Sequence, residues 1–283
     1  MRKLLSAYPK WLVFALAGLL GAGLFNAGYE LFFGGGSSSQ NLHIVASSIG
    51  FRFGVFGAGI TTAVFIAQRV LLGAEEFISD SIKPILAGSV LGFFAGAAAQ
   101  YFYSFVHFIG IDAGELPRIV AWAMAGGGLG IAISLAVPNL KMFRSFFYGT
   151  LGGAAGALGF LLVCAIASDV GGRLVGTAII GLFIGLSVAV AEATAKEGYL
   201  RVVWGPGEYT RVNLGEKPVT VGSSRESTIR MASSAGYPPI VATFSLQGGQ
   251  ATMVNHMSRS THALRNGNKL TLGSVVIEIH LFS

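Results

Sequence analysis

Two arginines near the end of the chain are the residues best suited to binding chemistry. Arg225 lies three residues after Gly222, and Arg259 directly follows Ser258. A guanidinium contacts a phosphate through two parallel hydrogen bonds, which makes arginine the preferred side chain for phosphate recognition. Two interpretations remain open at this point. The arginines either bind a phosphate on a partner or lie on an ordinary solvated surface.

Catalytic and metal-binding patterns are missing from the sequence. The chain has no nucleophile motif with partners, no phosphate-binding loop and no paired carboxylates. Cys164 is the single cysteine, which excludes an internal disulfide and a cysteine zinc site. His256 and His262 are six residues apart without a nearby cysteine or carboxylate, which is a weak metal pattern. We therefore expect no enzyme activity, no cofactor and no metal.

The composition divides the chain into two parts. Hydrophobic residues make up 53% and charged residues 11% of the 283 residues, whereas soluble domains carry about 25% charged residues. Residues 1–197 contain 11 Lys+Arg and 9 Asp+Glu, or 20 charges, and residues 198–283 contain 8 and 4, or 12 charges. We expect a transmembrane helical domain over 1–197 and a β-domain over 198–283. Lysine and arginine are not clustered with aromatic residues, so we expect no nucleic acid partner.

The first part contains six apolar runs that are each long enough to cross a membrane. A spanning helix needs about 20 mostly apolar residues. The first run is longer than the core of a signal peptide, and five similar runs follow it. The six runs are Trp11–Phe33, Phe51–Leu72, Pro84–His107, Ile119–Val137, Phe146–Ser168 and Leu174–Thr194.

Lysine and arginine predict the orientation of these spans, because they are enriched in cytoplasmic loops. Nine lie on the side of the N-terminus and three on the opposite side. We expect a multi-pass protein of the plasma (inner) membrane with both termini in the cytoplasm. The nine are Arg2, Lys3, Lys10, Arg69, Lys83, Lys141, Arg144, Lys196 and Arg201, and the three are Arg52, Arg118 and Arg173.

The spans repeat a glycine pattern, which indicates helical hairpins from an ancestral duplication. In the fourth and sixth spans, an arginine is followed by glycines 8 and 12 residues later. In the third and fifth spans, a basic residue is followed by glycines 5 and 9 residues later. Glycines four residues apart lie on one helix face and let two helices approach closely, although glycines can also line a pore. The paired glycines are Gly126 and Gly130, Gly181 and Gly185, Gly88 and Gly92, and Gly149 and Gly153.

Few polar residues occur inside the spans, and none of the charged ones lies at a midplane. Glu30 and Arg52 are placed to pair near the outer ends of their spans, and Glu192 lies four residues before Lys196. Transporters usually carry ionisable residues within the membrane. A small transporter or channel, with the β-domain as a regulatory cap, is therefore the alternative rather than the main interpretation.

The second part has short alternating runs separated by turn residues, as in a β-sandwich. The expected strands are Leu200–Trp204, Thr210–Leu214, Val219–Val221, Thr228–Met231, Ile240–Leu246, Ala251–Val254, Lys269–Leu272 and Val275–Phe282.

This part resembles a forkhead-associated (FHA) domain. The run Leu200–Gly222 is similar to the opening of that family, in which a strand, a Gly-rich turn and a second strand lead to a third strand ending in Ile-Gly-Arg. The end of the chain resembles the closing strand pair of the family. The resemblance implies a sandwich that binds phosphothreonine peptides through an arginine and a serine, with an asparagine that holds the peptide backbone.

The sequence departs from the family at those binding positions. Ser223 stands where the family has the arginine, and the serine–histidine region reads Pro-Pro-Ile-Val. We therefore expect a membrane-anchored interaction or scaffold protein that docks a protein partner or a larger membrane complex at the cytoplasmic face, rather than a phosphothreonine receptor. The candidate partner-binding residues are Ser223, Arg225, Ser258, Arg259 and Asn266, and membrane lipid is the other expected contact.

Overall fold

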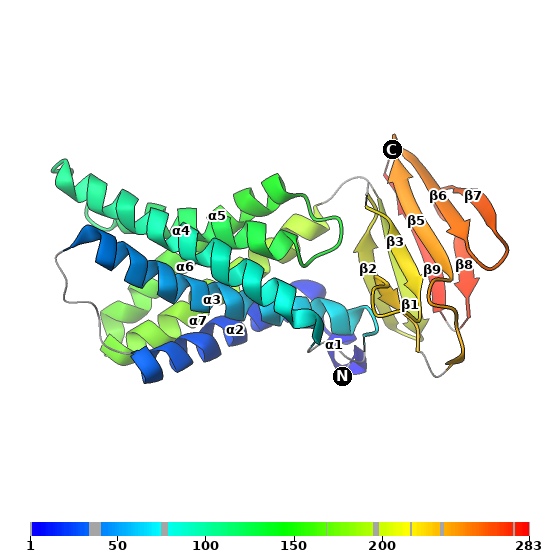
Figure 1. Cartoon of the computed structure of the whole chain (residues 1–283), viewed down its shortest axis with the longest axis horizontal. Helices are drawn as coiled ribbons and strands as arrows, with labels where there is room; N and C mark the ends of the chain where they lie inside the picture. The colour runs from blue at the N-terminus through cyan, green and yellow to red at the C-terminus, as the bar shows by residue number, and fades with distance from the viewer. Residues whose placement is uncertain are drawn as a thin grey trace.

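The chain folds into six long apolar helices followed by two β-sheets (Figure 1). This computed structural model describes residues 2–33, 41–74, 79–167, 169–194, 198–215, 217–232, 235–273 and 275–282. The expected fold class, a membrane helical bundle followed by an all-β sandwich, is confirmed. The sandwich lies at one end of the bundle, which we call the sandwich end, and the opposite end is the far end (Figure 1).

The helices follow the predicted apolar runs, but several ends are shifted, and α5, α6 and α7 begin three, four and five residues earlier than predicted. α3 begins nine residues earlier than predicted, because the side chain of Asn41 caps it by accepting a hydrogen bond from the backbone nitrogen of His43. α5 ends at Ser134, three residues early. The helices are α1 (Arg2–Ser6), α2 (Lys10–Phe33), α3 (Leu42–Leu71), η1 (Ser79–Ser81), α4 (Ile82–Phe108), α5 (Leu116–Ser134), α6 (Met142–Ile166) and α7 (Asp169–Ala193).

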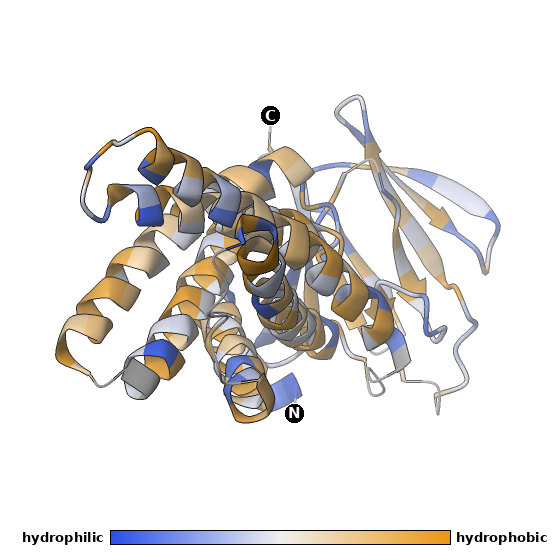
Figure 2. Cartoon of the chain, turned by 60° about the vertical axis from the view of Figure 1, so that its left-hand side comes forward, coloured by the Kyte–Doolittle hydropathy of each residue, from blue (hydrophilic) through white to orange (hydrophobic). Residues whose placement is uncertain are grey.

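The six long helices form a ring in which each packs on its neighbour in sequence and α7 closes onto α2. α3, α5 and α7 are the more buried helices, and α4 and α6 expose most of their length. Figure 2 shows hydrophobic residues over most of the helical surface and hydrophilic residues in connections and hairpin tips. Such a surface suits a lipid environment.

Glycines hold the ring together at three equivalent contacts. The backbone of α3 meets α4 at Gly57 and Gly88, and that of α5 meets α6 at Gly126 and Gly149. The third contact joins α7 to α2 at Gly181 and Gly18, so the bundle has an approximate threefold arrangement. The remaining paired glycines follow the same rule: Gly92 lies against Phe53, Gly130 against Ser145, Gly153 against Trp122, and Gly185 against Phe14.

The C-terminal part is a sandwich of a four-stranded sheet, in the order β2-β1-β9-β8, and a five-stranded sheet, in the order β4-β3-β5-β6-β7. All strand pairs are antiparallel except β3 with β4. The strands are β1 (Gly198–Gly205), β2 (Glu208–Asn213), β3 (Val219–Gly222), β4 (Ile229–Arg230), β5 (Ala242–Gln247), β6 (Gln250–Asn255), β7 (Ser260–Leu264), β8 (Lys269–Leu272) and β9 (Val275–Leu281).

One strand, β7, is absent from the sequence prediction. Residues 260–264 alternate weakly, because four of the five side chains are polar or small, and only Leu264 is buried. The strand forms by pairing along β6, so the tertiary structure rather than the local pattern determines it.

Candidate functional site

Ser223 holds a loop in place and has no donor left for a phosphate. Its hydroxyl lies 2.7 Å from the Tyr237 carbonyl oxygen and 3.0 Å from that of Pro238, and its single proton can serve only these acceptors. Its backbone nitrogen also donates to Pro238. Ser223 therefore joins the end of β3 to residues 237–238.

Arg225 and Arg259 lie at the same end of the five-stranded sheet but far apart along it. The strand register brings four strand termini to this end of the sheet: the end of β3, the start of β5, the end of β6 and the start of β7. Three strand steps separate β3 from β7, or about 14 Å at ~4.8 Å per step. The Arg225 carbonyl also accepts a hydrogen bond from Arg69 of α3, so this loop faces the bundle. The two arginines do not form a single phosphate cradle.

The other two candidates have different roles. Ser258 lies in the exposed β6–β7 turn, where its hydroxyl is 2.7 Å from that of Ser260, which is in turn 2.8 Å from Nε2 of His262. Arg259, in the same turn, is exposed and has a positive φ of 54°. Asn266 accepts a hydrogen bond from the backbone nitrogen of Leu281 and so anchors the β7–β8 turn.

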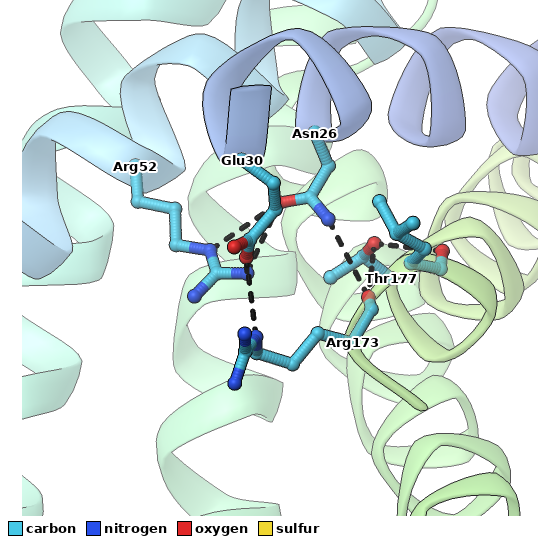
Figure 3. A network of polar contacts seen from close by, with 6 residues as sticks. Asn26, Glu30, Arg52, Arg173 and Thr177 are labelled. Atoms are coloured by element: carbon cyan, nitrogen blue, oxygen red, sulfur yellow. Dashed lines mark hydrogen bonds and ion pairs between the residues drawn. The ribbon is translucent and has the colours of Figure 1, made fainter. Parts of the chain in front are cut away.

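A polar network joins three helices at the far end of the bundle (Figure 3). Arg52 of α3 contacts Glu30 of α2 at 2.5 Å, which confirms the predicted pair, and also donates to the Asn26 amide oxygen. Arg173 of α7 lies 3.3 Å from the same carboxylate, and its carbonyl oxygen accepts bonds from Asn26 and Thr177. Two guanidinium groups share one carboxylate here, so the network joins α2, α3 and α7.

A second polar cluster joins the bundle to the sandwich. Lys10 at the start of α2 contacts Glu192 near the end of α7 at 2.6 Å. Asn213 of β2 donates to the Glu192 carbonyl oxygen at 3.1 Å, in a buried position. The sequence favours Lys196 as the partner of Glu192, but Lys196 lies outside the described residues, and Lys10 occupies that role in the structure.

The end of α3 makes the deepest contact with the sandwich. Leu72 belongs to the hydrophobic core of the sandwich, and its carbonyl oxygen accepts from the Arg230 nitrogen at 2.9 Å. Thr210 donates to the Leu71 carbonyl oxygen at 2.9 Å, fully buried. Arg69 donates to the carbonyl oxygens of Arg225 and Ser227.

Two further segments complete this junction. In the α5–α6 connection, Asn139 donates to the carbonyl oxygens of Asn213 and Lys217 at 3.0 Å each and accepts from the Lys217 nitrogen. In α1, Arg2 pairs with Glu208 at 2.6 Å and its guanidinium lies 4.3 Å from the Trp204 ring. Five separate segments of the helical part thus hold the sandwich.

No known family, curated protein or solved structure matches the chain. Across the ranges that the structure covers, no three histidine, cysteine or carboxylate side chains are grouped closely enough to hold a metal ion.

Sequence reasoning missed the junction. The residues that form it come from segments far apart in the chain, and each looks like an ordinary boundary or strand residue. They include Lys10, Asn139, Thr210 and Asn213. Only Asn139 could have been suspected from its residue type. Its φ is positive, at 53°, and asparagine tolerates this conformation better than most residues.

Proposed function

We propose that the protein is a non-enzymatic membrane docking protein. The helical bundle fixes an FHA-like sandwich at the cytoplasmic face of the plasma (inner) membrane, and the sandwich recruits a partner protein or a membrane complex. The observation that carries the proposal is the junction, which holds one side of the sandwich through buried hydrogen bonds and leaves β6 and β7 on the side away from the bundle (Figure 1). A recruiting domain needs such a fixed, outward-facing surface.

The free side has a charge suited to an acidic partner. Residues 227–277 contain no aspartate or glutamate. Arg259 and Arg265 lie just before and just after β7, and both are exposed. β7 is the edge strand of its sheet, and an extended segment can add to such an edge through backbone hydrogen bonds. We infer that the partner presents an extended acidic segment that pairs along β7.

The arrangement of strands supports the FHA-like assignment. β1, a glycine-containing turn, β2 and β3 ending at Gly222 follow the order that the family opens with, and β8 and β9 form the closing pair. The likeness does not extend to the phosphate-binding positions, because the Ser223 hydroxyl donates to carbonyl oxygens of residues 237–238. We propose docking without phosphothreonine recognition.

The bundle supports an anchor more than a transporter. Its largest fully buried side chains are aliphatic or aromatic, including Phe14, Ile60, Leu129, Ile133 and Ile184. A substrate or ion path needs polar side chains near the midplane of the membrane. The charged network of Figure 3 lies at the far end instead.

The test is affinity purification of the full chain from native membranes. We compare the wild type with the double variant Arg259→Glu/Arg265→Glu and with Lys217→Glu, an exposed charge reversal on the junction side. The proposal expects a partner that copurifies with the wild type and Lys217→Glu and is lost from the double variant. Equal recovery from all three would place docking elsewhere and contradict the proposal.

A further inference from the structure

A cavity of about 660 Å³ lies at the junction between the bundle and the four-stranded sheet. The α1–α2 connection, the end of α7, β1 and β2 form its walls. The lining includes five aromatic side chains: Tyr8, Trp11, Tyr199, Tyr209 and Phe282. Tyr8, Trp11 and Phe282 are each more than half exposed, so the cavity is open to its surroundings.

A buried carboxylate with one unpaired oxygen lines the cavity. Glu192 lines the wall, and only 5% of the residue is exposed. Its Oε1 is 2.6 Å from the Lys10 ammonium, whereas Oε2 is buried and has no hydrogen-bond partner. Buried polar atoms are normally paired. Because a carboxylate oxygen only accepts, the missing group must carry an N–H or O–H.

Two cations lie in the same wall. The Lys10 ammonium has three protons, and its polar contacts account for two: Glu192 and the Arg211 carbonyl oxygen at 3.4 Å. The Arg211 guanidinium lies 5.0 Å from the Tyr199 ring and forms no ion pair among the described residues. The cavity therefore offers a basic group for a phosphate and, beside it, an acceptor with aromatic walls for an ammonium.

The position of the cavity determines which molecule can reach it. It lies where α2 begins and α7 ends, which is the boundary of two spanning helices. Tryptophan and tyrosine prefer this level of a membrane, where head groups lie. We propose that the cavity binds the head group of a phospholipid with a primary ammonium, as in phosphatidylethanolamine. The ammonium donates to Glu192 Oε2, and the phosphate contacts Arg211 and Lys10.

The test uses the full chain, delipidated in detergent, and native mass spectrometry of the folded protein. Phosphatidylethanolamine, phosphatidylcholine and phosphatidylglycerol with identical acyl chains are added separately. We expect one phosphatidylethanolamine to be retained at least tenfold more tightly than either of the others. Phosphatidylcholine has no hydrogen-bond donor in its head group, and the hydroxyls of phosphatidylglycerol lack the positive charge that strengthens a hydrogen bond to a carboxylate. Equal retention of the three lipids would overturn the proposal.

Variants separate this site from general lipid binding. Glu192→Gln is expected to abolish the preference for phosphatidylethanolamine. Glu30→Gln, the same change in a carboxylate at the far end, is expected to preserve it. Should Glu192→Gln fail to fold, Arg211→Gln at an exposed position must weaken phosphatidylethanolamine retention at least fivefold. An unchanged preference in the folded Glu192→Gln variant, or unchanged phosphatidylethanolamine retention in the Arg211→Gln variant, would overturn the assignment.

A last arm distinguishes the lipid from a soluble ligand of the same chemistry. Phosphoethanolamine carries the head group without acyl chains. We expect millimolar phosphoethanolamine to leave the bound lipid in place, because the chains contribute most of the affinity. Displacement of the lipid at micromolar concentration would identify a soluble ligand site and overturn the lipid assignment. None of these outcomes depends on the partner of β7, so the two proposals fail separately.

Discussion

At the scale of single residues, Ser223 shows how one position changes the chemistry of a loop. The hydroxyl and the backbone nitrogen of Ser223 are both committed to residues 237–238, so the residue stabilises the loop rather than a ligand. Arg225 belongs to the same connection but faces the bundle through its carbonyl oxygen. The loop after β3 is thus held by its own polar groups and leaves the Ser223 hydroxyl no proton for a ligand.

We predict that the full chain binds a phosphothreonine peptide and its unphosphorylated form equally. A charge-assisted hydrogen bond to a phosphate contributes about 1.5–3 kcal/mol to the free energy of binding. A site that lacks two such bonds binds the phosphopeptide on the order of a hundredfold or more weakly. Titration calorimetry against a peptide library, with phosphorylated and unphosphorylated pools, measures the difference. Micromolar binding that needs the phosphate and disappears in Arg225→Ala or Arg259→Ala would contradict the prediction.

Glu278 gives the sandwich a defined response to acid. It lies on β9 between Lys269 at 2.8 Å and Arg201 at 3.1 Å. The hydrogen bond from Lys269, helped by the charges of Lys269 and Arg201, holds the pKa of Glu278 below its ordinary value. The ionised form is therefore favoured by folding. Its contribution is complete above the unfolded pKa of about 4.3 and is lost as the pH falls through the lower folded value.

We predict that Glu278→Gln flattens the acid dependence of sandwich unfolding between about pH 5 and pH 3. Trp204 fluorescence in a Trp11→Phe/Trp122→Phe background reports on the sandwich alone. The wild type should lose more thermal stability than the variant over this interval. Glu226→Gln, an exposed carboxylate in the β3–β4 connection, is the matched control. If the thermal stability of Glu278→Gln and of the wild type falls equally over this interval, Glu278 does not contribute to the acid dependence.

At the scale of elements, the glycine contacts explain how six helices with little polar surface pack tightly. Helices in lipid gain nothing from hiding apolar surface from one another, so close van der Waals packing must hold them. A Cβ on Gly126 would lie 2.5 Å from the Gly149 carbonyl oxygen and 2.7 Å from Cα of Gly153. Such a contact leaves no space for any other residue.

We predict that Gly126→Ala lowers the stability of the bundle by about 1–3 kcal/mol, because the added methyl group forces the α5 and α6 backbones apart. Gly28→Ala is the control: its Cβ would meet nothing within 4 Å, and the change should be neutral or raise stability by up to about 1 kcal/mol. Thermal unfolding in detergent measures both. If Gly126→Ala and Gly28→Ala change the unfolding temperature equally, the repeated glycines do not act as close-packing positions.

The elements also show what a sequence can and cannot predict. All six spans were recognisable, because about 20 apolar residues have few alternatives to a spanning helix. β7 was not, because its polar, exposed side chains carry no alternating pattern. The Glu30–Arg52 pair was predictable from matching depth, whereas the Lys10–Glu192 pair was not, since nothing local relates residues 182 positions apart.

At the scale of the whole molecule, the approximate threefold arrangement places α2 in an unexpected role. The repeat was evident in the third to sixth spans. In α2, Lys10 is not followed by glycines 5 and 9 residues later, so the sequence pattern does not include this helix. In the structure Gly18 meets Gly181 as Gly88 meets Gly57, so α2 completes the third contact. The same closure brings Lys10 to Glu192 and places the N-terminus beside the sandwich (Figure 1). Ring closure and attachment of the sandwich are therefore coupled.

We predict that the sandwich end faces the cytoplasm and the far end the outside. The arginines at the far end are paired with carboxylates: Arg52 and Arg173 with Glu30, and Arg118 with Glu115. The greater number of basic residues lies at the sandwich end, and such residues are retained in the cytoplasm during insertion. In a Cys164→Ala background, an impermeant thiol reagent applied to sealed cells should label Asp112→Cys in the exposed α4–α5 connection. It should reach Gln250→Cys, exposed at the start of β6, only after the membrane is opened. Labelling of Gln250→Cys in sealed cells would reverse the orientation and, with it, the cytoplasmic docking surface.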